Sequence, residues 1–223
     1  MSAGRVPFLR QLAQEDCDEL LRRTRRRSFA EQTIILRAGA AGDDVMVVLE
    51  GRVKLVARGA EEREVVLAIR GPGELVGEMS ALGADRRTAA AVALEDVEVG
   101  IIGGDEFRAF LREHPDVALV VIRMLVRRLA EATRDLVAQA TQDSLGLVAK
   151  RLLELGDHLG VASAAGNQFE LSLTQDELAR WTGATRETVS RALRLMRQLG
   201  WVSTDHRKIT VLDPAALRER SGG

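Results

Sequence analysis

The segment from Pro115 to Gln142 contains no glycine and no second proline, and it constrains the fold more than any other part of the chain. As an α-helix with a rise of 1.5 Å per residue, it would be about 40 Å long. Its apolar residues recur at spacings of three and four, which is typical of a helix that packs against a partner helix. These residues are Ala118, Ile122, Leu125, Leu129, Ala132 and Leu136. A second, shorter stripe would pack on the helix's own domain, at Val117, Val121 and Met124.

Composition limits the functional classes that the chain can belong to. Its 223 residues, 46% hydrophobic and 29% charged, are enough for one large or two small globular domains. Because the net charge is −1, any affinity for nucleic acid must come from a local basic patch. The single cysteine, Cys17, excludes a disulfide framework and a cysteine-based metal or iron–sulfur site. The first residues lack an apolar signal region and no apolar run reaches about 18 residues, so we expect a cytoplasmic protein.

The part of the chain before the long helix changes its hydrophobic period near Phe29. Residues 5–27 are expected to form short helices, with the basic run Arg22–Arg27 as a solvated helix face rather than a nucleic-acid patch. Beyond Phe29, short segments rich in valine and isoleucine and separated by glycines predict a β-sandwich or barrel. The expected strands are Thr33–Leu36, Val45–Glu50, Arg52–Arg58, Glu64–Ile69, Arg87–Ala93 and Val97–Ile102. A helix over Asp105–Arg112 would then lead into the long helix.

One stretch within this barrel, GELVGEMSALGADRRTAAAV, is neither ordinary strand nor ordinary turn. Gly77-Glu78 leads into Met79–Leu82, which can form one helical turn whose free backbone N–H groups favour an anion. Arg87-Thr88 follows and would offer a guanidinium fork and a hydroxyl group to phosphate oxygens. Glu78 is an acceptor for a ribose hydroxyl. The combination therefore predicts a site for a phosphate-containing ligand.

The part of the chain after the long helix predicts a winged helix-turn-helix. A helix over Asp143–Leu159 and a short strand over Phe169–Leu173 come first. Thr174 then forms a capping box with Glu177 and starts a helix that ends at Gly183. After a three-residue turn, a second helix is expected over Arg186–Leu199, followed by a wing of Val202–Ser203 and Ile209–Leu212.

The second of these helices has one basic side and one apolar side. Its start is where a recognition helix meets base edges in the major groove, and arginine and glutamate can read guanine and cytosine there. Such a pattern is also compatible with a solvated charged face, an alternative that the turn and the wing disfavour. The polar side consists of Arg186, Glu187, Ser190, Arg191, Arg194 and Arg197, and the apolar side of Val189, Leu193 and Met196.

Two motifs resemble the Crp/Fnr family of transcription regulators. Gly77-Glu78 and Arg87-Thr88-Ala89 resemble the phosphate-binding cassette of that family's cyclic-nucleotide-binding domain, and Thr185–Arg191 resembles its recognition helix in the cyclic-AMP receptor class. The resemblance extends from about Phe8 to Leu212. It implies an α+β fold with a cyclic-nucleotide-binding β-barrel (jelly roll), a long dimerisation helix and a winged helix-turn-helix. The corresponding segments are residues 1–114, 115–142 and 143–223.

The resemblance implies cyclic AMP as the allosteric effector. Arg87, Thr88 and the backbone around Ser80 would bind the cyclic phosphate, and Glu78 would bind the ribose 2′-hydroxyl. Two consecutive hydroxyl residues of the long helix, one from each subunit, meet the adenine in cyclic-AMP-responsive relatives. The matching positions here are Ala132 and Thr133, and only Thr133 keeps its hydroxyl. The full implied set is Gly77, Glu78, Met79, Ser80, Arg87, Thr88, Arg128, Ala132 and Thr133.

The resemblance also implies that a homodimer reads an inverted TGTGA-like repeat in double-stranded DNA. Arg186 and Arg191 would read guanines, Glu187 a cytosine, and Thr188 would contact phosphate. The other implied DNA contacts are Thr174, Gln175, Thr185, Ser190, Ser203, His206 and Lys208. An activator of this kind would also contact RNA polymerase.

By periodicity alone the long helix is equally a core helix, and its place between a nucleotide barrel and a DNA reader favours a dimer interface. That interface would consist of Ile122, Leu125, Leu129, Ala132 and Leu136. The main alternative is a regulator of the same family that needs no ligand or responds to a different effector. We expect no enzyme, because no catalytic constellation stands out, and no metal site, because the three histidines lie in separate segments.

Overall fold

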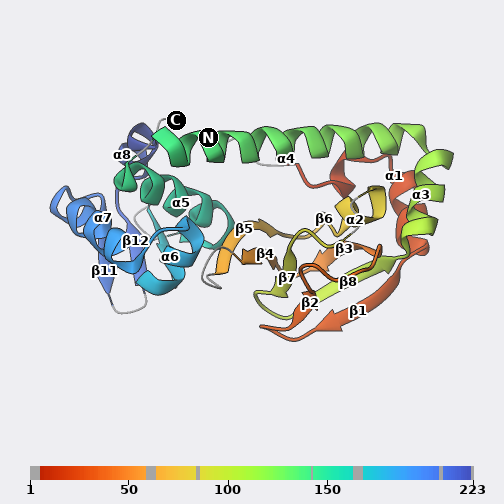
Figure 1. Cartoon of the computed structure of the whole chain (residues 1–223), viewed down its shortest axis with the longest axis horizontal. Coiled ribbons are helices and arrows are strands. Elements are labelled where there is room, and N and C mark those ends of the chain that lie inside the picture. Colours follow the sequence, from red (N-terminus) through yellow and green to blue (C-terminus); the bar gives the residue numbers. More distant parts are fainter. Residues whose placement is uncertain are drawn as a thin grey trace. The chain divides into compact units, whose positions relative to one another are not determined.

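The computed structural model describes residues 6–58, 64–83, 86–141, 143–162, 168–205 and 208–221. It divides into two compact units, the first formed by Met1–Arg58 with Leu67–Ala130 and the second by Gly59–Val66 with Glu131–Gly223. The predicted long helix is present as α4, Pro115–Thr141 (Figure 1). It contributes residues to both units. The two units are therefore described one at a time. No helix among the described residues has the length and apolar character that crossing a membrane requires.

Two four-stranded sheets form the body of the first unit, as a jelly-roll prediction requires, and only Glu64–Val66 at the start of one edge strand belong to the second unit. The strand orders are β1-β8-β3-β6 and β2-β7-β4-β5. Each predicted strand region contains a strand, and those at Val45–Glu50 and Val97–Ile102 have the predicted bounds, whereas the strand predicted from Arg87 begins only at Ala90. The first sheet consists of β1 (Arg25–Phe29), β3 (Val45–Glu50), β6 (Leu75–Val76) and β8 (Val97–Ile102). The second sheet consists of β2 (Ile34–Leu36), β4 (Val53–Arg58), β5 (Glu64–Arg70) and β7 (Ala90–Ala93).

The prediction of helix up to residue 27 is wrong in its last part. A 3-10 turn (Leu9–Gln11) and α1 (Gln14–Arg22) are helical, but Arg25–Phe29 is strand β1. β1 pairs antiparallel with β8, from Arg25 opposite Ile101 to Phe29 opposite Val97. The basic side chains of this strand are exposed, so its sequence lacks the apolar alternation that predicts a strand. The residues form a strand because they pair with β8.

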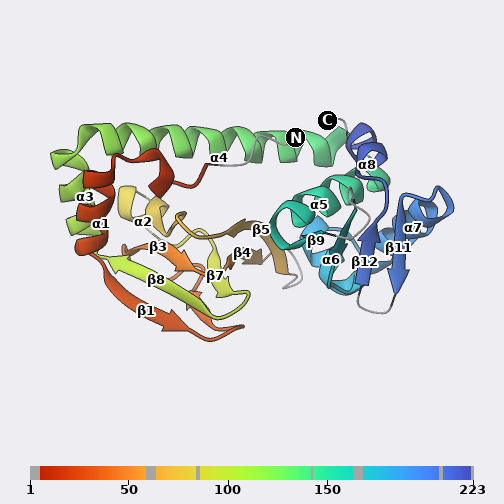
Figure 2. The ribbon, with the colours of Figure 1, turned by 180° about the vertical axis from the view of Figure 1, so that it is seen from behind.

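Strand β3 separates two hydrophobic clusters and is buried on both faces, which explains its uninterrupted apolar run. Val45 and Val47 pack with the helices, whereas Met46 and Val48 pack between the two sheets. The helix-side cluster contains Leu20 of α1 together with Phe107 and Phe110 of α3 (Gly104–Glu113). Both views show α1 and α3 side by side at one end of the first unit (Figures 1 and 2).

The first half of α4 packs on the barrel of its own unit, as the shorter stripe predicts. Val117, Val121 and Met124 are buried in the helix-side cluster, and Val120 joins them. Arg128 continues this face one turn beyond Met124. The predicted dimer seam is exposed at Ile122, Leu129 and Leu136, whereas its Leu125 is half-buried and packs against the helix-side cluster.

The second unit has the predicted winged helix-turn-helix and two elements beyond the prediction. The helix α5, Ser144–Leu159, is capped by Asp143, whose side chain accepts a hydrogen bond from the Gly146 N–H. The strand order is β11-β12-β10-β9. The short strand β9 and the last helix α8 were not predicted. The remaining bounds are β9 Val161–Ala162, β10 Phe169–Leu171, α6 Gln175–Thr182, α7 Arg186–Gln198, β11 Val202–Asp205, β12 Lys208–Val211 and α8 Pro214–Arg220.

Candidate functional sites

The predicted helical turn of the cassette is present as α2, Glu78–Leu82, and Gly77 precedes it in the left-handed region at φ 86°. A Cβ atom at Gly77 would lie 2.7 Å from Nη1 of Arg87 and 2.8 Å from the carbonyl oxygen of Asp44. Only glycine satisfies both the backbone conformation and this close approach. The glycine of the motif therefore has a geometric role, which is to let α2 start directly against Arg87.

Arg87 is the central cation of this site and its side chain is almost completely buried, at 6% exposure. Its Nη1 donates to the Gly77 carbonyl oxygen at 2.9 Å and to Ser80 Oγ at 3.3 Å. Its backbone is paired with the preceding loop, since Arg87 N–H donates to Ala40 O at 3.0 Å and Gly39 N–H donates to Arg87 O at 2.8 Å. The guanidinium group is thus fixed from both ends of the side chain.

Two opposing effects act on the charge of Arg87. Burial lowers the pKa of its guanidinium, and the nearby Asp44, Asp43 and Glu78 carboxylates act in the opposite direction. Arginine nevertheless stays charged in proteins. Within the residues that the structure describes, Nε and Nη2 of Arg87 make no hydrogen bond to protein. These two N–H groups form one edge of the guanidinium, which is the fork that binds two phosphate oxygens.

Thr88 and Met79 lie at the mouth of a pocket beside this cation. Both are exposed, and Thr88 Oγ1 lies 3.8 Å from Met79 Sδ. The pocket has a volume of about 50 Å³, well below the roughly 300–1,000 Å³ of pockets that enclose small molecules. Its wall combines the cassette with apolar residues of the barrel: Leu36, Leu55, Val76, Gly77, Glu78, Met79, Ser80, Arg87, Thr88, Ala89 and Ala91.

Glu78 is 3% exposed and its carboxylate is already paired with a second arginine. Arg128 of α4 donates from Nη1 to Glu78 Oε1 at 2.6 Å and from Nη2 to the Leu75 carbonyl oxygen at 3.0 Å. The predicted set thus contains three residues, Glu78, Arg87 and Arg128, that the first unit brings together around α2. Ala132 and Thr133 are exposed residues on the part of α4 that belongs to the second unit.

The exposed apolar surface of α4 is wider than the predicted seam. Among the seam residues, Ile122 is 54% exposed, Leu129 69% and Leu136 68%, while Leu125 is half-buried and Ala132 is exposed. Three further large apolar side chains of this helix are exposed, at Leu119, Val126 and Val137. A helix with this much exposed apolar area is typical of an interface with another chain.

The helix-turn-helix is organised by two N-caps. Thr174 and Glu177 form the predicted capping box at the start of α6. Thr185 caps α7, and its Oγ1 lies 3.0 Å from Thr188 Oγ1 and accepts from the Thr188 N–H at 3.2 Å. Gly183 closes α6 at φ 70°, which allows the tight turn between the helices. Thr174 and Thr185, both predicted as DNA contacts, therefore also fix the two helix starts.

The predicted polar side of α7 faces solvent, and the predicted apolar side is its core. Val189, Leu193 and Met196 are buried. Arg186 is exposed and its Nε lies 3.5 Å from Asp176 Oδ1 of α6. Arg197 donates to Thr204 Oγ1 of the wing at 2.9 Å, so it braces the wing. The other exposed residues of this side are Glu187, Arg191 and Arg194, with Thr188 and Ser190 half-buried.

The remaining predicted DNA contacts lie at the edges of this surface. Ser203 of β11 and Lys208 of β12 are exposed, and Lys208 Nζ lies 2.5 Å from Glu170 Oε2 of β10. Gln175 is half-buried at the first position of α6. The predicted contact at His206 falls outside the described residues.

One charged cluster was not predicted. His114 Nδ1 lies 2.7 Å from Asp16 Oδ1, and Nε2 lies 3.4 Å from Glu19 Oε2. Arg23 pairs with Glu19 and, at 2.6 Å, with Glu113. His114, Glu19 and Glu113 are close enough to hold a cation, but the Arg23 guanidinium already neutralises the carboxylates. Asp16 is 98 residues from His114 in sequence, so no local pattern indicates this cluster.

Two family models match the chain over the regions just described. A cyclic nucleotide-binding domain matches residues 26–114, and a Crp-like helix-turn-helix domain matches residues 148–220. The cyclic AMP receptor protein of Thermus thermophilus is 34% identical over 97% of both chains. The chain belongs to the Crp/Fnr family of transcription regulators.

Other members of the Crp/Fnr family support the same placement. The CRP-like cAMP-activated global transcriptional regulator of Mycobacterium tuberculosis (strain CDC 1551 / Oshkosh) is 30% identical over 86% of each chain. The crystal structure of a CRP/FNR-family transcriptional regulator from Thermus thermophilus has a TM-score of 0.74 and 30% sequence identity, and it covers 89% of this chain and 99% of that one. These relatives are transcription regulators, so the chain is a regulator with a cyclic-nucleotide-binding domain and a DNA-binding domain.

Proposed function

We propose that this Crp/Fnr regulator is controlled by cyclic AMP, acts as a homodimer and reads an inverted TGTGA-like repeat in double-stranded DNA. The observation that carries the effector is Arg87. It is a buried cation anchored through Nη1, and its Nε and Nη2 edge makes no hydrogen bond within the described residues. That edge matches the two exocyclic oxygens of a cyclic phosphate. Two relatives at 30% and 34% identity carry cyclic AMP in their names, which supports the same effector.

The other cassette residues have matching roles in this proposal. Gly77 and Met79 frame the pocket, Ser80 orients Arg87, and the exposed Thr88 hydroxyl donates to the phosphate. Glu78 accepts from the ribose 2′-hydroxyl through Oε2, while Oε1 stays with Arg128. Because the pocket measures about 50 Å³, only part of a nucleotide lies within it and the rest extends past its mouth. The family resemblance implies that Thr133, on the long helix of one of the two subunits, meets the adenine, without a hydroxyl at Ala132.

The DNA-reading part of the proposal rests on the exposed start of α7. Arg186 and Arg191 would bind guanine and Glu187 cytosine, with Thr188, Ser190 and the outer residues on phosphates. The outer residues are Thr174, Gln175, Thr185, Ser203, His206 and Lys208. The exposed apolar face of α4 supports a symmetric dimer. Two recognition helices about 34 Å apart would then match successive major grooves.

The proposed segments are a sensor at 1–114, a dimerisation helix at 115–142 and a DNA-binding domain at 143–223. We propose a regulator and not an enzyme because the relatives named above are transcription regulators. Contact with RNA polymerase follows if the protein activates its targets. A regulator of the same family that uses another effector, or none, remains the second candidate, favoured by Ala132 and its missing hydroxyl.

Titration calorimetry tests the effector. Cyclic AMP and cyclic GMP would be titrated into the wild type, into Arg87→Leu and into Arg86→Leu. Arg86 is the matched control, since it is an exposed neighbour that donates to the Gly39 carbonyl oxygen at 2.9 Å. We expect heat with cyclic AMP for the wild type and Arg86→Leu, and none for Arg87→Leu. Wild-type protein that gives no heat at high concentration refutes cyclic-AMP control and favours the second candidate.

A gel shift with a TGTGA-type palindrome tests the DNA site separately. We expect a shifted band that strengthens with cyclic AMP. Equal binding to a scrambled duplex contradicts the proposed sequence.

A further inference from the structure

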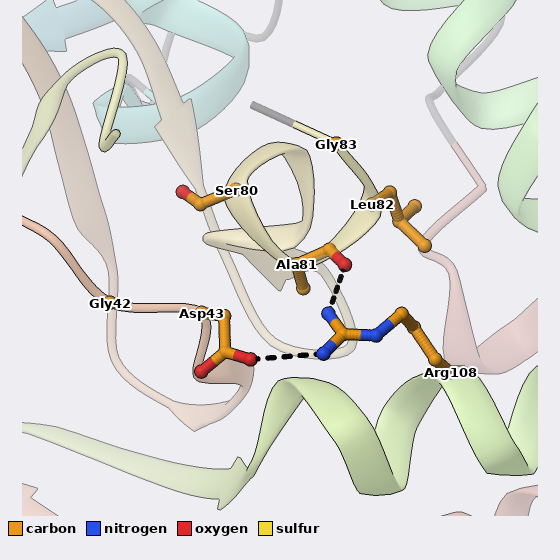
Figure 3. A pocket seen from close by; sticks show the side chains of 7 residues that line it. All are labelled: Gly42, Asp43, Ser80, Ala81, Leu82, Gly83 and Arg108. Atoms are coloured by element: carbon orange, nitrogen blue, oxygen red, sulfur yellow. Dashed lines mark hydrogen bonds and ion pairs between the residues drawn. The ribbon is translucent and has the colours of Figure 1, made fainter. Parts of the chain in front are cut away.

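We propose that Arg108 of α3 is a positioning residue of the phosphate cassette, which it holds at two points through hydrogen bonds to α2 and to the loop beside Arg87. The proposal rests on the proposed nucleotide site and adds a residue that the cassette motif does not contain. Arg108 lies beside a hollow of about 500 Å³ between α2, α3 and the 42–43 turn, and Figure 3 shows its guanidinium between Ala81 and Asp43.

The first point is the last turn of α2. Arg108 Nη1 donates to the Ala81 carbonyl oxygen at 2.5 Å. The last four carbonyl groups of any helix lack a partner within the helix, and a helix of one turn depends on outside donors. Arg87 binds the other end of α2, at the Gly77 carbonyl oxygen and Ser80 Oγ. Arg87, which follows α2, and Arg108 of α3 therefore bind α2 at its start and at its last turn.

The second point is the loop that carries the backbone of Arg87. Arg108 Nη2 donates to Asp43 Oδ2 at 3.2 Å. Four residues earlier, the Gly39 N–H and the Ala40 carbonyl oxygen form the backbone pair with Arg87. A Cβ atom at Gly42 would lie 3.4 Å from Arg87 Nη2, so this loop passes directly along the fork that is proposed to bind phosphate. Displacement of Asp43 would therefore move both the backbone and the fork of Arg87.

Asp43 also lies against the start of α3, the helix that carries Arg108. A Cβ atom at Gly104, the first residue of α3, would lie 2.2 Å from Asp43 Oδ2. The carboxylate thus rests against the backbone at the helix start, in a place that only a glycine leaves open. Arg108 also pairs with the fully exposed Asp105 at 2.7 Å, one turn earlier in the same helix. That local pair orients the guanidinium on the α3 surface before it reaches α2 and the loop.

The side chain of Arg108 is suited to positioning and not to core packing. It is 34% exposed and borders an open hollow, so its replacement by methionine removes little buried apolar area. What it removes is the hydrogen bonds to Ala81 and Asp43. A cassette without them would retain Arg87 but would spend part of its time in arrangements that do not fit the ligand. Ligand affinity falls in proportion to the fraction of binding-competent protein.

The experiment compares wild type, Arg108→Met, Arg108→Lys and the control Arg112→Met, which changes an exposed arginine one turn later in α3. Hydrogen exchange is measured on the full-length proteins without nucleotide, and cyclic AMP affinity is measured by calorimetry well below the unfolding temperature. For Arg108→Met we expect faster exchange in residues 78–82 and 39–44, with unchanged exchange in β3 and β8. We expect about tenfold weaker binding, which corresponds to about 1.4 kcal/mol.

Arg108→Lys keeps the charge but reaches one acceptor at a time, so its affinity should lie between wild type and Arg108→Met. Arg112→Met should match the wild type in both measurements. Unchanged exchange in α2 and the loop, or unchanged affinity in Arg108→Met, overturns the proposal, as does faster exchange throughout the barrel. If the wild type gives no heat with cyclic AMP, the effector proposal fails, and the exchange pattern of Arg108→Met still decides the positioning role of Arg108.

Discussion

The guanidinium of Arg128 on α4 lies 2.6 Å from the carboxylate of Glu78, the first residue of α2, and both side chains are largely buried. The pair joins the long helix to the cassette within the first unit. It also leaves one carboxylate oxygen, Oε2, for the proposed ribose contact. A ligand that draws Glu78 toward its ribose therefore acts directly on a side chain of α4. This gives the proposed effector a physical route to the helix that carries the exposed apolar face.

Arg128→Met should destabilise the protein by about 3–5 kcal/mol, because it leaves the Glu78 carboxylate buried without its cation. The hydrogen bond to the Leu75 carbonyl oxygen is lost as well. The double variant Glu78→Gln/Arg128→Met should recover part of this loss, since no unpaired charge remains. Urea unfolding followed by far-UV circular dichroism measures both differences.

The matched control for that prediction is Arg123→Met, an exposed arginine of α4 that donates to the Leu119 carbonyl oxygen in its own helix at 3.2 Å. It should change stability by less than about 0.5 kcal/mol. A double variant as unstable as the single Arg128→Met would contradict a role for the unpaired carboxylate.

Local sequence patterns were enough for most elements of the fold. The valine-rich run of β3, the capping box at Thr174 and the glycine-free run of α4 each follow from rules that involve neighbours within a few residues. The same holds for the cassette, where Gly77 and Arg87 stand ten residues apart and meet across one short helix. These features were predictable because the chain itself keeps the interacting residues close.

Features that depend on distant partners could not be predicted in the same way. β1 is a strand because β8 pairs with it, about 70 residues later, and its own arginines carry no alternation. Arg108 matters through Asp43, 65 residues away in sequence. The charged cluster of Arg23 and His114 joins α1 to the end of α3. In each of these three cases the fold, and not the local sequence, determines which residues meet.

Gly77→Ala should be more damaging than Gly39→Ala, although both glycines have positive φ. A non-glycine residue in the left-handed region costs roughly 1–2 kcal/mol, and this is the whole cost at Gly39, where nothing lies within 4 Å of the added Cβ. At Gly77 the added atom also collides with Arg87 and with the Asp44 backbone. We expect a loss of about 3 kcal/mol in stability and weaker cyclic AMP binding, measured by thermal unfolding and calorimetry. Equal effects of the two substitutions would show that the close contact at Gly77 is unimportant.

Leu129→Glu should weaken the proposed dimer, because it places a charge on the exposed apolar face of α4, where Leu129 is 69% exposed. Charges are depleted from the buried centres of interfaces, and an unpaired one there costs several kcal/mol. Arg134→Glu introduces the same side chain at another exposed position of this helix and serves as the control. Sedimentation equilibrium should give a shift toward monomer for Leu129→Glu only. A wild type that sediments as a monomer at all concentrations would refute the dimer.

Glu154 of α5 should make stability depend on pH in a direction opposite to that of an ordinary paired carboxylate. Burial raises its pKa from the usual 4.5, an effect reinforced by Asp135 and opposed by Arg151. The folded state therefore favours the protonated form, so this group's stabilising contribution is full below pH 4.5 and is lost as pH rises through the raised folded pKa.

Glu154→Gln should therefore match the wild type in acid and exceed its stability near neutral pH. The Glu154 side chain is 38% exposed and forms a salt bridge with Arg151 at 2.6 Å. Because solvent screens this group, the gain in unfolding free energy should stay below about 1 kcal/mol. Denaturant unfolding across this pH range measures the difference, with Asp157→Asn as a variant that removes one exposed negative charge from the same helix. A gain that is equally large below pH 4.5 would contradict the direction assigned to Glu154.

Arg186→Ala and Lys208→Ala should affect DNA binding in two different ways. Arg186 stands at the start of α7, where base edges are read, and Lys208 stands in the wing, where only the DNA backbone is within the proposed reach. Loss of Arg186 should cost about 1–3 kcal/mol of discrimination at one base pair, whereas loss of Lys208 should weaken all sequences alike and lower the salt slope by about one. Fluorescence anisotropy with duplexes varied one position at a time separates the two. Uniform weakening by Arg186→Ala would mean that this arginine binds phosphate and that Arg191 and Glu187 must account for the sequence preference.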